Sequence, residues 1–143
     1  MERFYLGRLG CLTKHGWRQF KVANILGEHF RSGEWANINR GRRCGSVIVT
    51  NVRRKTRYAV VKRFIMCGND DTTMFAVVSW FTVPVYPYAP NPLVVKVRES
   101  HTPDVQPRPV LSLTKIIPTK VTVLPCGDGV HFYMLREKGT DII

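Results

Sequence analysis

Residues 56–65, TRYAVVKRFI, and residues 74–84, MFAVVSWFTVP, decide the fold of this chain. Both are short runs rich in Val, Phe and other residues that favour β-strands. The polar segment between them contains GNDD at residues 68–71. Because Gly, Asn and Asp tolerate a positive φ, this segment predicts a turn that pairs the two runs as a β-hairpin.

Other parts of the chain have the same strand chemistry. A second turn, CGDG at residues 126–129, predicts a hairpin between the last two strands. Short helices fit only at Leu111–Ile116 or Asn24–Phe30. We expect a mainly β fold, a barrel or sandwich of about seven short strands with at most one or two short helices. The predicted strands are Gln19–Leu26, Ser46–Val52, Tyr58–Met66, Met74–Val83, Leu93–Arg98, Lys120–Leu124 and His131–Arg136.

Length and charge narrow the possible functions. The chain has 143 residues, 44% of them hydrophobic, which suits one domain over residues 1–143. Its 22 Lys and Arg against 10 Asp and Glu give a net charge of +12, which favours polyanionic partners. No apolar run approaches the roughly 20 residues that cross a bilayer, and the N-terminus lacks the apolar core of a secretory signal. We therefore expect a soluble intracellular protein with no membrane partner.

Basic residues are concentrated between residues 36 and 69, where no acidic residue occurs. RRKTR at residues 53–57 falls where a hairpin or loop would join two strands, so several guanidinium groups would project from one small surface. This arrangement predicts contact with the phosphates of DNA or another nucleic acid. The alternative is a solvated basic loop that serves solubility alone. The basic residues are Arg40, Arg42, Arg43, Arg53, Arg54, Lys55, Arg57, Lys62 and Arg63.

The aromatic residues of the predicted strands follow a recognisable order. An aromatic residue lies early in one strand, a Trp-Phe-x-x-Pro motif ends the next, and an isoleucine-containing loop precedes a final aromatic strand. This order resembles the BAH (bromo-adjacent homology) domain of chromatin proteins over roughly residues 44–138. The resemblance implies a small BAH-like barrel with residues 1–43 as an N-terminal extension, and a nuclear setting with DNA or nucleosomes as partners. The matching residues are Tyr58, Trp80, Phe81, Pro84, Ile116, Ile117, Phe132 and Tyr133.

Some BAH domains hold methylated lysine in an aromatic cage, because electron-rich ring faces attract a cation. The resemblance would make Tyr58 and Trp80 the walls of such a cage, with a histone tail as its ligand. Thr82 stands where cage-forming members commonly carry an aromatic residue, so Tyr86 or Tyr88 would supply the missing wall. The competing interpretation is that Tyr58 and Trp80 are ordinary core residues.

Two other functions stay open beside the chromatin module. FYMLREKGTDI and KVANILGEHFRSG also resemble the β-rich module that follows the transposase region in some KDZ-type transposon-encoded proteins. The chain could accordingly be a protein-interaction domain of such a protein. It could also be a sequence-tolerant binder of single-stranded nucleic acid, whose aromatic side chains stack on bases while basic groups follow the backbone.

Catalytic chemistry has little support in the sequence. The histidines are scattered, and only His131 beside Asp128 could act in acid-base chemistry. The four cysteines lie far apart, with the spacing of neither a zinc site nor a disulfide framework. We expect a protein that is not an enzyme, with no catalytic residues, no metal, no cofactor and no small-molecule substrate.

Overall fold

The computed structural model is built almost entirely of antiparallel β-strands. It describes residues 4–7, 17–33, 43–67, 73–87, 94–100 and 107–136, with the backbone alone for residues 4–7 and 43–44. In these ranges the helical element is a 3-10 turn, η4 (Leu113–Lys115), and no helix is long and apolar enough to cross a membrane. The strands are β1 (Phe4–Gly7), β2 (Arg18–Phe20), β3 (Val22–Ile25), β4 (Glu28–Arg31), β5 (Arg43–Cys44), β6 (Val47–Val52), β7 (Lys55–Met66), β8 (Met74–Trp80), β9 (Val94–Arg98), β10 (Val110–Ser112), β11 (Ile116–Ile117), β12 (Val121–Pro125) and β13 (His131–Arg136).

The mainly β class is confirmed, and each of the seven predicted strands corresponds to strand in the structure. The first of them is interrupted at Lys21, which separates β2 from β3. The additional strands β1, β4, β5, β10 and β11 are two to four residues long, too short for a composition pattern to show. Both predicted hairpins pair as expected, β7 with β8 and β12 with β13, although residues 68–72 of the first turn lie outside the described ranges.

One of the two candidate helices is wrong and the other is reduced to a single turn. Asn24–Phe30 forms the β3–β4 hairpin, because Leu26 and Gly27 both adopt a positive φ and reverse the chain. Leu111–Ile116 contains only η4, which the side chain of Ser112 caps by accepting the N–H of Thr114.

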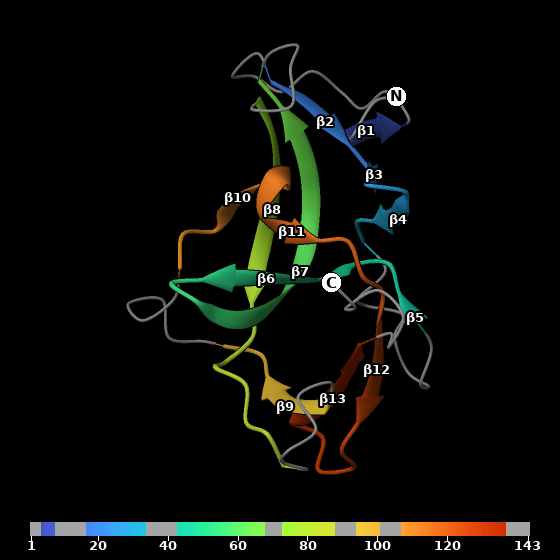
Figure 1. Ribbon diagram of the computed structural model, residues 1–143. Coiled ribbons are helices and arrows are strands. Elements are labelled where there is room, and N and C mark those ends of the chain that lie inside the picture. The colour runs from blue at the N-terminus through green and yellow to red at the C-terminus, as the bar shows by residue number, and fades with distance from the viewer. Residues whose placement is uncertain are drawn as a thin grey trace.

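Three sheets are arranged around β7, the long curved strand in the centre of Figure 1. The central sheet has the order β10-β8-β7-β6-β11, and β2 pairs with the far end of β7. A four-stranded sheet, β5-β12-β13-β9, lies below it in Figure 1, and a three-stranded sheet, β1-β3-β4, lies at the upper right.

The central sheet separates two apolar cores. Because side chains alternate along a strand, Ala59 and Val61 of β7 face one core while Tyr58 and Val60 face the other. The first core consists of Phe20, Ala23, Ile25, Phe30, Ile48, Ala59, Val61, Phe64, Ala76, Val78, Trp80, Leu113 and Ile116. The second core consists of Val47, Val49, Tyr58, Val60, Phe81, Val95, Val97, Val121, Val123 and Met134. Residues 17–33 thus supply part of the first core.

A bulge in β7 keeps charged residues out of these cores. The register of β7 against β8 shifts between Val61 and Arg63, which leaves Lys62 unpaired. In a strand without this bulge, alternation would turn Arg63 toward the first core and Phe64 away from it. With the bulge, Phe64 is fully buried while Lys62 and Arg63 are both exposed.

Candidate nucleic-acid interface

The β6–β7 hairpin ends in a two-residue turn formed by Arg53 and Arg54. Val52 pairs with Lys55 across the turn, and the φ angles of Arg53 and Arg54 are 50° and 68°. Positive φ at both central residues is the type I′ geometry, which fits the twist of a hairpin and favours Asn and Gly. Because a side chain with a Cβ is strained there, each arginine costs about 1 kcal/mol of folding free energy.

The charged side chains at this turn face solvent. Arg53, Arg54 and Lys55 are exposed, and none of them forms an ion pair within the described residues. Lys115 adds a fourth exposed cation at the side of the hairpin, because its carbonyl accepts the hydroxyl of Thr50 at 2.6 Å. We call Arg53, Arg54, Lys55 and Lys115 the basic tip.

Lys115 could not be found from local sequence. It lies in LTKII, a segment without other charges, and it reaches the hairpin only because β11 pairs with β6. Ile116 is the register partner of Thr50, so the residue before it lies beside the end of β6.

Arg57 was predicted to contact nucleic acid, and this prediction is wrong. Its residue is only 8% exposed, and Nη2 donates a hydrogen bond to the carbonyl of Phe81 at 2.9 Å. The guanidinium carbon lies 5.7 Å from the centre of the Trp80 ring, a cation–π distance. Burial lowers the pKa of Arg57, because a desolvated guanidinium holds its proton less strongly. Arg57 therefore belongs to the packed interior and not to the exposed basic surface.

The remaining cations of the predicted surface form a second exposed group. Lys62 and Arg63 lie at the bulge, seven and eight residues after Lys55, which is about 23 and 26 Å along β7 at a rise of about 3.3 Å per residue. The single basic surface expected from the sequence is therefore divided. Arg40, Arg42 and the side chain of Arg43 fall outside the described part of the chain.

The predicted aromatic cage is not formed. Ala59 is the register partner of Trp80, so Trp80 shares the face of Ala59, while Tyr58 points to the opposite face. Accordingly, Trp80 packs in the first core and Tyr58 in the second, and both are almost completely buried. The Trp80 indole Nε1 donates to the carbonyl of Arg108 at 3.0 Å. Both rings serve as core residues, the competing interpretation of the sequence.

The other proposed cage residues lie apart. The hydroxyl of Thr82 accepts the backbone N–H of Arg98 at 3.1 Å, while Tyr86 is exposed and Tyr88 is outside the described residues. Trp80 does border a cavity of about 380 Å³. None of the other proposed cage residues of the described chain lines that cavity, whose lining includes Val60, Lys62, Ser79 and Glu99.

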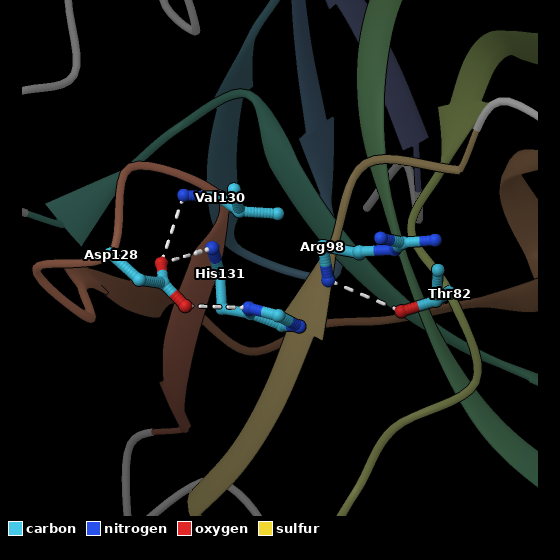
Figure 2. Close-up of polar contacts among 5 residues, drawn as sticks. All are labelled: Thr82, Arg98, Asp128, Val130 and His131. Atoms are coloured by element: carbon cyan, nitrogen blue, oxygen red, sulfur yellow. Dashed lines mark hydrogen bonds and ion pairs between the residues drawn. The ribbon is translucent and has the colours of Figure 1, made fainter.

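Asp128 and His131 are brought together, within the β12–β13 turn (Figure 2). One carboxylate oxygen of Asp128 accepts the backbone N–H groups of Val130 and His131, each at 2.8 Å. The other oxygen lies 2.7 Å from Nδ1 of His131. These hydrogen bonds, first those from the backbone, hold the pKa of Asp128 well below its usual range. These contacts connect the two ends of the turn, so stabilisation of the turn is sufficient to account for the contact between Asp128 and His131.

Comparison of the chain with models of protein families, with curated proteins and with solved structures found no match. The function is therefore inferred from the geometry and charge of the basic tip and its surroundings.

Proposed function

We propose that this chain is a nucleic-acid-associated binding module that contacts DNA through the basic tip. One observation carries the proposal: two arginines occupy a type I′ turn that disfavours them, and both are exposed and unpaired within the described residues. Residues that strain a turn without stabilising the fold are best explained by what they bind. A cluster of exposed cations on one small surface binds phosphates.

The charge of the whole chain supports the same partner. A net charge of +12 attracts polyanions over a distance, and Lys62 and Arg63 form a second exposed positive group apart from the tip. The resemblance to BAH domains adds a chromatin setting and a nuclear location to the proposal. We leave a histone tail out of it, because Tyr58 and Trp80 share no pocket.

One observation favours a second candidate, a binder of single-stranded nucleic acid. Arg63 pairs with Val77 and Ile65 with Phe75, so these residues share the face of the central sheet that lies opposite the first core. Phe75 is half-buried there, and Arg63 is exposed. An aromatic ring beside a guanidinium group suits stacking on an unpaired base.

The proposal can be tested by measuring binding to a short DNA duplex and to its single strands over a range of salt concentrations. For Arg53→Ala/Arg54→Ala we expect about 30-fold weaker duplex binding, at roughly 1 kcal/mol per lost charged contact with the DNA. The slope of log K against log salt should fall by about 2. The fold should survive, because exposed charges contribute little to stability.

Arg18→Ala/Lys21→Ala is the matched control. It removes two exposed cations from the region of β2, which pairs with the far end of β7. This variant should bind duplex almost as well as the wild-type protein. Binding that does not depend on salt, or an equal loss in the control variant, would exclude the basic tip as the interface.

A further inference from the structure

The free end of the β6–β7 hairpin has a definite length. Thr50 and Arg57 are a buried register pair, and the hairpin beyond them is exposed or half-buried. Two register pairs, Asn51–Thr56 and Val52–Lys55, and the Arg53–Arg54 turn therefore extend past this buried pair, and among them Val52 packs against the edge of the first core. At about 3.3 Å per residue this free end is about 10 Å long, and its two strands lie about 5 Å apart. Figure 1 shows this end of β6 and β7 at the left edge of the molecule.

These dimensions match one groove of duplex DNA. The major groove is about 12 Å wide and about 8.5 Å deep, and it admits a two-stranded β-ribbon. The minor groove, about 6 Å wide, is too narrow for a ribbon with its side chains. Building on the proposed function, we propose that the hairpin enters the major groove and that Arg53 and Arg54 contact base edges there.

The side chains of the basic tip indicate which base the hairpin would recognise. Arg53 and Arg54 lie at the leading end of the hairpin, where a guanidinium group can donate two hydrogen bonds to O6 and N7 of guanine. Lys55 and Lys115 lie farther back, as residues that contact the phosphates on either side of the groove would. Asn51 and Thr56 are paired across the hairpin, with the Thr56 hydroxyl 3.3 Å from the Asn51 amide oxygen. The ligand class is thus duplex DNA with guanines accessible in the major groove.

The test changes the DNA and leaves the protein intact. Replacing guanine by 7-deazaguanine removes the N7 acceptor from the major groove while it keeps base pairing and phosphates. We expect the wild-type protein to bind a guanine-rich duplex at least tenfold more tightly than the same duplex with 7-deazaguanine, because each bidentate contact of Arg53 and Arg54 would lose its hydrogen bond to N7.

A variant that preserves the charge distinguishes recognition of guanine from electrostatic attraction to the phosphates. Arg53→Lys/Arg54→Lys keeps both charges but lacks the planar fork that forms bidentate contacts. It should retain the salt dependence of the wild-type protein and bind the two duplexes equally well. Arg18→Lys/Lys21→Arg, which exchanges cations at the far end of β7, should keep the full preference for guanine.

The outcomes distinguish this inference from the proposed function. Salt-dependent wild-type binding that is equal for guanine and 7-deazaguanine would overturn groove reading and leave the proposed function standing. Tighter binding to single strands than to duplex would also overturn it, in favour of the sheet face that carries Phe75. Absence of salt-dependent binding to any of these DNAs would overturn both proposals.

Discussion

Two hairpin turns of this protein have the same geometry and different residues. The β3–β4 turn is formed by Leu26 and Gly27, with φ angles of 51° and 94°, and the β6–β7 turn by Arg53 and Arg54, with φ angles of 50° and 68°. In the first turn glycine accepts its conformation without strain, and the side chain of Asn24 accepts the N–H of Gly27 at 3.0 Å.

The β6–β7 turn has neither a glycine nor, within the described residues, a side chain that caps the turn, although its backbone also adopts positive φ at both central residues. No glycine relieves it, and no side chain accepts a hydrogen bond from its backbone within the described residues. Turn geometry alone therefore does not account for Arg53 and Arg54 at these positions. The proposed function supplies a reason for these two residues, which is contact with duplex DNA.

The largest effect is expected at Arg57, which belongs to the same RRKTR run but to the interior. Arg57→Ala should lower the free energy of unfolding by about 2–4 kcal/mol, because it leaves a cavity beside Trp80 and the Phe81 carbonyl without its donor. Urea denaturation measures this change, with Arg53→Ala as the control that should be nearly neutral. Equal stability of the two variants would remove the distinction between interior and tip arginines.

A smaller and opposite effect on stability is expected at the tip. Arg53→Asn/Arg54→Gly supplies the residues that a type I′ turn prefers and should stabilise the protein by about 1–2 kcal/mol. The same variant should lose duplex binding to the extent that Arg53→Ala/Arg54→Ala does. Thermal unfolding and a binding titration on one sample measure both. A variant that gained no stability would show that the arginines do not strain the turn.

The converse substitution places an arginine in the β3–β4 turn. Gly27→Arg should destabilise the protein by about 1 kcal/mol, because a Cβ at φ 94° is strained even though no atom lies within 4 Å of it. Chemical denaturation measures the loss. Gly27→Ala should show the same loss, whereas a much larger effect of arginine than of alanine would point to a clash and not to backbone conformation.

The smallest effect is expected at a third turn, between β12 and β13, where the carboxylate of Asp128 accepts hydrogen bonds from the backbone of the turn. The pKa of Asp128 is depressed in the folded state, so its contribution to stability is present above pH of about 4 and is lost as the pH falls below that value. Asp128→Asn should be slightly less stable than the wild-type protein at pH 7, and the difference should shrink in acid. Thermal unfolding from neutral to acidic pH measures it. A difference that grew on acidification would contradict the depressed pKa.

Much of the fold could be predicted from composition and turn residues. The strands that became β7, β8, β12 and β13 are long enough for β-branched and aromatic residues to show, and GNDD and CGDG place their turns. The position of RRKTR at a hairpin was predicted for the same reason, since it separates two apolar runs. Short strands such as β5 and β11 could not be predicted, because they form only by pairing with distant partners.

The candidate site was only partly predictable. Arg53, Arg54 and Lys55 were predicted to be exposed because they are charged, and they are exposed, since a tight turn leaves its side chains in solvent. Arg57 was predicted to be exposed for the same reason but is buried, because both faces of β7 are covered at that position. The facing of Tyr58 and Trp80 depended on the register between β7 and β8, which no property of either strand alone reveals.

The β class, the chain reversals at RRKTR, GNDD and CGDG and the excess of positive charge could be read from the amino-acid sequence, because each depends on residues that are neighbours in the chain. Only the tertiary structure settled which arginines face water, which side of the sheet each aromatic ring occupies, where the chain reverses between β3 and β4 and that Lys115 joins the basic tip. Those outcomes depend on strand register and on the bulge at Lys62, which are set by packing between segments far apart in the sequence.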